Sequence, residues 1–347
     1  MITMLSSSEV RAPETASARI DLPNAPLRQI VLASLASIAW FLAAALTFYW
    51  PNNDDWDYTN VLIGIQIALA LFAALCAIGG IQTRLLTPSW AARVRRGFAL
   101  SPWLIVLALG ITVWEVVTAK LGLLPRPFFA PPQALLGVYL DDYPRLVTSL
   151  AHSLRLLLLG YFLGAATGFI AGVGIGWSRA VGYWLHPILR LIGPLPSIAW
   201  LPLAFFFFPS SFSASIFLIA LATAFPVAVL TWSGIANVNP AYYDIARTLG
   251  GRPAFLIARV AIPAALPSVF VGLFMGLGAS FSVLIVAEMM GVKAGLGWYL
   301  QWAQGWAAYS NMYAALLVMA IMCSSLISLL FFFRDKLLAW QKGLMKW

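Results

Sequence analysis

The sequence predicts an all-α membrane protein with about eight membrane-spanning helices. Of the 347 residues, 62% are hydrophobic and only 10% are charged, whereas about a quarter of the residues in an ordinary soluble domain are charged. Apolar runs of roughly 20 residues, long enough to cross a bilayer as a helix, recur along the chain. The net charge of +9 comes from basic residues at the ends of these runs and not from one patch, so we expect no nucleic-acid partner.

The eight candidate spans are separated by short connections. They are residues 30–50, 61–81, 102–119, 154–177, 185–208, 215–236, 268–290 and 313–333. The fifth is the least regular, because four prolines fall in it: Pro187, Pro194, Pro196 and Pro202. Proline removes a backbone hydrogen bond from a helix, so we expect this span to be broken or kinked.

The distribution of lysine and arginine predicts which ends of the spans face the cytoplasm. With the N-terminus inside, 16 of the 21 basic residues fall in cytoplasmic segments, and the outer loop 51–59 has three aspartates and no basic residue. Cytoplasmic loops of membrane proteins are enriched in Lys and Arg. We therefore expect residues 1–28 to be a cytoplasmic tail and both termini to be cytoplasmic. The first apolar run is too long for a typical signal peptide, so we expect it to remain as a span.

Glycines recur every four residues along the fourth span. Gly160, Gly164, Gly168 and Gly172 share one face if the span is a helix. Such stripes let helix backbones approach closely in lipid. We expect this face to pack against another helix.

Residues that carry chemistry are scarce. Cys76 and Cys323 both lie inside apolar spans, which predicts neither a disulfide nor a metal site. The sequence contains no G-x-x-x-x-G-K-[ST] phosphate loop, so we expect no cofactor bound by this chain. Glu115 and Glu288 are the acids of the apolar segments. Both lie near the outer ends of their spans, where we expect them to reach water, and Glu288 is the stronger functional candidate.

The segment 241–267, AYYDIARTLGGRPAFLIARVAIPAALP, is a polar, arginine-bearing block between two apolar spans. We expect residues 241–249 to form a short helix, with Asp244 near its N-terminus, where a carboxylate suits the helix dipole. Gly250 and Gly251 are expected to end this helix in a left-handed turn. A short helix on the cytoplasmic side is a surface that a partner protein can grip.

This segment resembles the Glu-Ala-Ala loop of binding-protein-dependent ABC importer permeases. Asp244, Ile245 and Ala246 stand at the Glu-Ala-Ala positions, and Gly250 stands at the glycine that follows after three intervening residues. Asp in place of Glu keeps the charge on a side chain one methylene shorter. Three further stretches resemble the nitrate/sulfonate/taurine/bicarbonate subfamily of these permeases: 123–136 (LLPRPFFAPPQALL), 192–208 (IGPLPSIAWLPLAFFFF) and 286–300 (VAEMMGVKAGLGWYL).

The resemblance implies the transmembrane domain of a type I ABC importer in a bacterial inner membrane. Such a domain has about six core spans, so residues 29–98 are expected to be two additional N-terminal helices and a basic connection. Residues 99–340 are then the permease core, with the coupling loop at 237–267. The implied partners are two ATPase subunits that bind ATP and Mg, a second permease copy, a periplasmic or lipid-anchored substrate-binding protein and membrane lipid.

The resemblance also implies roles for particular residues. The residues expected to couple to the ATPase are Asp244, Ile245, Ala246, Arg247, Leu249 and Gly250. The residues expected along the translocation pathway or its gate are Pro196, Trp200, Pro202, Glu288 and Met289. The chain itself would catalyse no covalent chemistry.

The cargo that the resemblance implies is a small anion: nitrate, an aliphatic sulfonate such as taurine, or bicarbonate. Two other classes of function stay open at this point. A secondary transporter or channel acting alone is disfavoured by the coupling-loop pattern. A membrane-embedded enzyme lacks a clustered set of His, Asp or Cys residues, since His152 and His186 lie far apart in the sequence.

Overall fold

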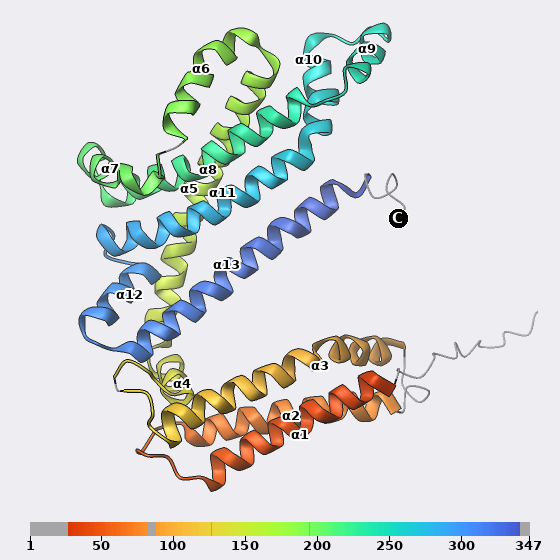
Figure 1. The fold of residues 1–347 in the computed structure, drawn as a ribbon. Coiled ribbons are helices and arrows are strands. Elements are labelled where there is room, and N and C mark those ends of the chain that lie inside the picture. The colour runs from red at the N-terminus through yellow and green to blue at the C-terminus, as the bar shows by residue number, and fades with distance from the viewer. Residues whose placement is uncertain (1–26, 82–87, 126, 194, 341–347) are drawn as a thin grey trace, which may run out of the picture. The chain divides into compact units, whose positions relative to one another are not determined.

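The computed structural model describes residues 27–81, 88–125, 127–193 and 195–340, and these residues form helices and no strand (Figure 1). Seven of the described helices are long and apolar enough to cross a membrane, and there are eight if one bent helix pair counts as a span. The all-α membrane fold is thereby confirmed. Most of the expected tail 1–28, and residues 82–87 of the basic connection, lie outside the described residues.

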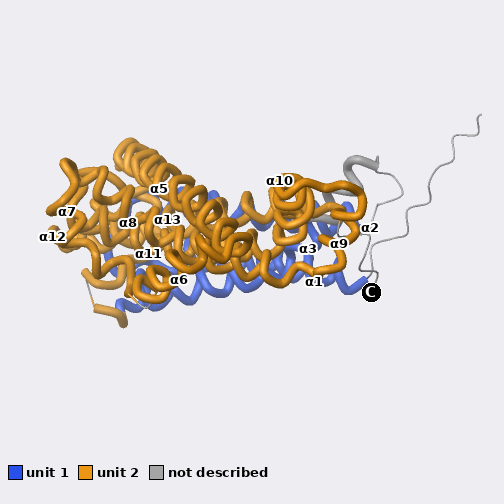
Figure 2. Tube along the Cα trace, turned by 90° about the horizontal axis from the view of Figure 1, so that it is seen from above, with its two compact units in different colours: residues 1–122 blue, residues 123–347 orange. Residues whose placement is uncertain are grey.

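The chain divides into two compact units, residues 1–122 and 123–347 (Figure 2). The first contains α1 (Leu27–Tyr49), α2 (Thr59–Ile81), α3 (Pro88–Glu115) and the π-helical turn η2 (Val116–Lys120). On α1, small buried residues such as Ala33, Ala36 and Ala43 recur every three or four positions, which lets α2 and α3 pack against it. We expected two extra spans before a core beginning at residue 99, whereas this unit groups α3 with the first two helices.

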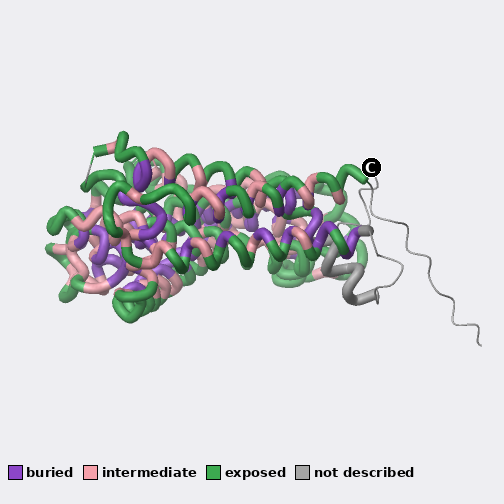
Figure 3. The backbone as a smooth tube through the Cα atoms, turned by 90° about the horizontal axis from the view of Figure 1, so that it is seen from below, coloured by how far each residue is buried: buried purple, intermediate pink, exposed green. Residues whose placement is uncertain are grey.

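The second unit contains the remaining helices. They are α4 (Pro132–Asp141), α5 (Tyr143–Trp177), α6 (Arg179–Ile192), η3 (Ser197–Trp200), α7 (Leu201–Phe207), α8 (Ser211–Ala236), α9 (Pro240–Thr248), α10 (Pro253–Phe255), η4 (Leu256–Ala261), α11 (Ile262–Met290), α12 (Leu296–Gly305) and α13 (Tyr309–Leu337). Helix α8 packs against both α5 and α11. Its Leu218 and Ile219 are fully buried in the main apolar cluster, and Figure 3 shows buried residues alternating with exposed ones along the helices.

The glycine stripe of α5 lies directly against α8. A Cβ atom placed on Gly164 would lie 2.3 Å from the carbonyl oxygen of Ala220, and one placed on Gly168 would lie 2.4 Å from that of Ala224. Gly160 and Gly172 face the same helix one turn to either side. Only the absence of a side chain at these positions lets the two backbones approach this closely.

The fifth span is broken at its prolines, as expected. Helix α6 is followed by η3 and α7, and the pair is bent by 91°. Pro196 precedes the first residue of η3, and Pro202 lies in the first turn of α7. Pro194 lies outside the described residues. Proline is tolerated in the first turn of a helix because the N–H that it lacks has no intrahelical partner there.

The seventh span begins earlier than its apolar pattern predicts. We expected the loop to run to residue 267, but a continuous rod of 38 residues extends from Pro253 to Met290 through α10, η4 and α11. Pro263 lies in the first turn of α11, directly after the π-helical η4. The wider π-helical turn changes the hydrogen-bond pattern before the proline, so the rod continues across it.

Candidate functional site

The two ends of helix α9 are determined by residues that favour the start and the end of a helix. The side chain of Asn239 accepts a hydrogen bond from the N–H of Ala241 at 3.0 Å, and Pro240 occupies the first turn. At the other end Gly250 has φ +84°, and the N–H of Gly251 donates to the carbonyl of Ala246 at 2.9 Å. The predicted short helix with a left-handed glycine at its end is thereby confirmed.

One face of α9 anchors it to the second unit. The ring of Tyr243 lies 5.9 Å from that of Trp177 at the end of α5, and burial raises the pKa of the Tyr243 phenol. Ala246, one turn later, is buried. Tyr243 and Trp177 pack against a small apolar cluster that contains Ile235 of α8 and Ala261 of η4. The position of α9 is therefore tied to three neighbouring helices.

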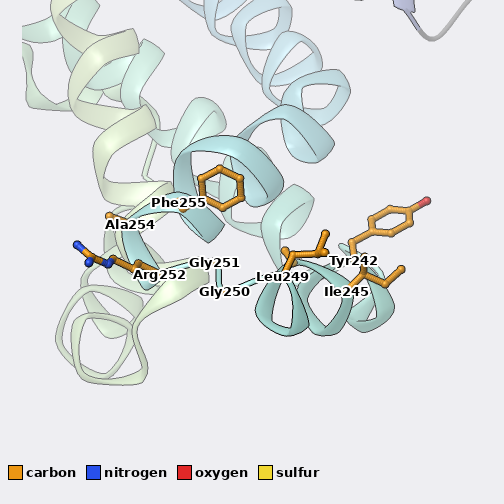
Figure 4. Close-up of a pocket in the computed structure, with 9 residues that line it drawn as sticks. Tyr242, Ile245, Leu249, Gly250, Gly251, Arg252, Ala254 and Phe255 are labelled. Carbon is orange, nitrogen blue, oxygen red and sulfur yellow. The ribbon is translucent and has the colours of Figure 1, made fainter.

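The opposite face of α9 is apolar and exposed. Tyr242, Ile245 and Leu249 follow a spacing of three and four residues, and Leu249 is 82% exposed. With Arg252 and Phe255 beyond the glycine turn they line a groove of about 520 Å³ (Figure 4). An apolar stripe on a short helix outside the spans is typical of a surface that docks into a partner protein.

The charged residues of α9 stabilise the helix less than the sequence suggested. We expected Asp244 to act near the helix N-terminus, but the helix begins at Pro240, so Asp244 lies in the second turn, where the dipole effect has fallen off. Its carboxylate instead pairs with Arg247 at 3.4 Å, with both side chains mostly exposed. An exposed pair of this kind contributes at most about 1 kcal/mol.

Four of the six expected coupling residues line the groove, and two lie beside it. The four are Ile245, Ala246, Leu249 and Gly250. The sequence reasoning missed Tyr242, Tyr243 and Phe255. The spacing of Tyr242, Ile245 and Leu249 would have revealed the exposed stripe, because residues three and four apart share a helix face.

A second hollow lies where the broken span meets α8 and α11. This cavity of about 400 Å³ is lined by Pro196 and Ser197 of the break, Phe225 of α8, and Met275 and Ser282 of α11, among others, and none of its described lining residues is ionisable. Of the expected pathway residues only Pro196 lines it. Trp200 packs against the main apolar cluster, Pro202 begins α7, and Glu288 and Met289 lie in the last turn of α11.

Glu288 does not reach water, contrary to expectation. It is 1% exposed, and the Ser153 hydroxyl lies 2.7 Å and 2.9 Å from its two carboxylate oxygens. The N–H of Gly297 donates to Oε2 at 2.8 Å. The expectation was wrong because α12 folds back over the end of α11: its Gly297 N–H, together with the hydroxyl of Ser153 on α5, supplies donors that a position near a span end does not reveal.

Glu115 is likewise buried, within the first unit. The hydroxyl of Thr47 donates to its carboxylate at 2.7 Å, and the ammonium of Lys120 lies 3.7 Å from it. Lys120 also donates to the carbonyls of Thr47 and Trp50 at the end of α1. These contacts attach both members of the buried ion pair to the end of α1.

The fold defines a multi-pass membrane protein with a short helix, α9, whose apolar face is exposed outside the spans. The family described as "Binding-protein-dependent transport system inner membrane component" matches residues 157–340. An aliphatic sulfonates transport permease of Bacillus subtilis is 28% identical, over 72% of this chain and 91% of the relative. A nitrate import permease of Synechococcus elongatus is 26% identical, over 69% and 87%.

The chain belongs to this family of binding-protein-dependent transport system inner membrane components. It is the permease subunit of an ABC importer, a transport component and not a catalyst. A solved structure of an amino acid ABC transporter shares the fold, with a TM-score of 0.50 and 19% identity over 58% of this chain and 98% of that one. A secondary transporter acting alone is not favoured.

Proposed function

We propose that this permease imports a small oxyanion, with two copies of the chain forming the pathway and two ATPase subunits driving it. An external substrate-binding protein delivers the anion, and both termini of the permease are cytoplasmic. ATP and Mg are bound by the ATPase subunits. The anion is nitrate, an aliphatic sulfonate such as taurine, or bicarbonate, since the relatives named above are a sulfonate and a nitrate permease.

The observation that carries the coupling role is the exposed apolar stripe of α9. Its inner face is fixed to α5, α8 and η4, while Ile245 and Leu249 are exposed. A rigid helix with such a face can enter a groove on an ATPase subunit and pass movement of that subunit into the spans. Asp244 and Arg247 would lie at the polar rim of this contact.

The cavity at the broken span supports the assignment of the pathway. Met275 and Ser282 lie on one exposed face of α11 and border the cavity, so a single chain leaves it open. A second copy closing this face would complete the enclosure. The described lining has no ionisable side chain, which suits rapid passage of an anion, because a solute bound too tightly cannot leave.

The stripe is tested by placing a charge in it. Ile245→Asp puts a carboxylate in the proposed contact, whereas Ala241→Asp adds the same charge on α9 outside the groove. We expect Ile245→Asp to be present at normal permease levels but to lose the ATPase on purification. We expect Ala241→Asp to retain the ATPase. Equal retention of the ATPase by both variants would show that the groove is not the docking surface.

A further inference from the structure

We propose that Glu288 is a positioning residue that fastens α12 to the last turn of α11, so that movement received at α9 is carried to the opposite end of the core. This inference rests on the proposed coupling role of α9. It gives Glu288 a part in transport without contact with the solute, since Glu288 does not line the cavity at the broken span.

The rod that contains α11 connects α9 with the contact of Glu288. Helix α9 contacts η4 near the start of this rod, and Glu288 lies in the last turn of α11 at its end. Figure 1 shows α11 running away from α9. At 1.5 Å per residue, the 38 residues from Pro253 to Met290 measure about 57 Å along the helix axis. This length exceeds the roughly 30 Å of bilayer hydrocarbon. A displacement of the rod at η4 therefore reaches Glu288 if the rod moves as one body.

The carboxylate of Glu288 holds the first turn of α12. It accepts a hydrogen bond from the N–H of Gly297 at 2.8 Å and one from the hydroxyl of Ser153 on α5. The same Ser153 oxygen accepts a hydrogen bond from the N–H of Leu296 at 2.8 Å. Two of the N–H groups at the start of α12, which have no partner within the helix, are thus satisfied by this pair of side chains, and a carboxylate there also suits the helix dipole.

Two glycines make room for this contact. Gly295 has φ +110°, and a Cβ atom on it would lie 2.2 Å from Oε1 of Glu288. A Cβ atom on Gly297 would lie 2.7 Å from the carbonyl oxygen of Ile285. The carboxylate fits only against bare backbone, so α12 cannot shift along α11 without breaking the contact.

A second group of polar contacts holds the same short helix further along. The hydroxyl of Tyr299, which is fully buried, donates to the carboxylate of Asp142 at 2.6 Å. Asn311 of α13 donates to the Tyr299 oxygen at 2.7 Å. Helix α12 is therefore held as a rigid piece, and the Glu288 contact is where the end of α11 acts on it.

The first experiment measures coupling in vesicles that contain permease, ATPase and binding protein. Ser153→Ala removes the hydroxyl from the contact, and Glu288→Gln removes the charge. We expect the maximal rate of ATP hydrolysis stimulated by loaded binding protein to fall about tenfold in each, because an unpaired buried polar group is costly. Assembly with the ATPase and basal hydrolysis stay at the parent level in Ser153→Ala, and the half-stimulating concentration of binding protein is unchanged.

The matched control is Ser280→Ala. Ser280 also lies buried on α11, but its hydroxyl pairs with Thr223 of α8 at 2.6 Å and does not touch α12. We expect this variant to keep parental stimulation. Parental stimulation in Ser153→Ala and Glu288→Gln as well would overturn the transmission role.

The second experiment does not depend on transport. Hydrogen exchange of residues 291–305 in the purified permease reports opening of α12. We expect faster exchange in Ser153→Ala and Glu288→Gln and no change in Ser280→Ala. Unchanged exchange in all three would show that Glu288 does not fasten α12 to α11. If loaded binding protein does not stimulate ATP hydrolysis in vesicles with the unsubstituted permease, the proposed function is contradicted. The exchange result would still decide whether Glu288 fastens α12.

Discussion

Single residues determine whether α9 can act as a rigid element. Gly250 has φ +84°, and a Cβ atom built on it would meet nothing within 4 Å. A substitution there is therefore opposed by backbone conformation alone and not by a clash. A substitution at Gly250 therefore tests whether the left-handed turn is needed, without also testing whether space for a side chain is available.

Gly250→Val is expected to disrupt the turn after α9, at a cost of about 1–2 kcal/mol for an L-residue held in the left-handed region. Gly250→Asn is the matched control, because asparagine adopts this region more readily. We expect normal permease levels in both, with ATPase recruitment weakened only in the valine variant. The measurement is the amount of ATPase that co-purifies with each permease. Equal recruitment by the two variants would mean that the turn is not needed.

The buried pair of Glu115 and Lys120 gives a second prediction at this scale. Glu115→Ala leaves the Lys120 ammonium without its carboxylate in a site where both side chains have no exposure. We expect a loss of about 3–5 kcal/mol in the stability of the first unit. Replacing both residues, as Glu115→Leu with Lys120→Met, is expected to recover most of it. Thermal unfolding in detergent measures both; a double variant as unstable as Glu115→Ala would contradict this explanation.

Among the contacts between helices, that between α5 and α8 depends directly on the glycines of α5. Gly168→Leu places a side chain where a Cβ atom alone would lie 2.4 Å from the Ala224 carbonyl. Overpacking of this kind costs about 1–3 kcal/mol, so we expect a lower unfolding temperature and less assembled complex. Gly110→Leu is the control, because a Cβ atom there meets nothing within 4 Å. Equal stability of the two variants would show that α5 and α8 do not need close contact.

Local patterns in the sequence predicted the helices, the break at the fifth span and the glycine turn after α9. Each depends on residues adjacent in the chain, such as Pro196 or Gly250. The burial of Glu288 could not be predicted in this way, because its donors Ser153 and Gly297 come from separate helices. The early start of the rod at Pro253 was missed for a different reason: Arg252 and Arg259 interrupt the apolar pattern, so the helix begins outside the apolar run.

The whole molecule combines a unit that the family match covers with one that it does not. The match begins at residue 157, so the first unit, residues 1–122, lies outside it. The orientation of the chain follows from the basic residues and stays a prediction. It applies to α9 as well as to the loop 51–59 when the bent pair of α6 and α7 counts as one span, because five spans then separate the two.

This orientation is tested with single cysteines in a chain that lacks Cys76 and Cys323. Asp55→Cys lies in the exposed loop between α1 and α2, and Thr248→Cys lies on α9 outside the groove. We expect an impermeant thiol reagent to label Asp55→Cys in intact cells and Thr248→Cys only after permeabilisation. Labelling of Thr248→Cys in intact cells would reverse the orientation.

We expect this permease to move a small oxyanion only when an ATPase and a binding protein act with it. The direct measurement is uptake of labelled nitrate, taurine or bicarbonate into vesicles that contain the purified permease, with ATPase and ATP on the α9 side. We expect accumulation of one of these anions that requires ATP, the ATPase and the loaded binding protein together, and that Ile245→Asp abolishes. Accumulation by the permease alone, driven by an ion gradient and indifferent to ATP, would show that the chain is not a subunit of an ATP-driven importer.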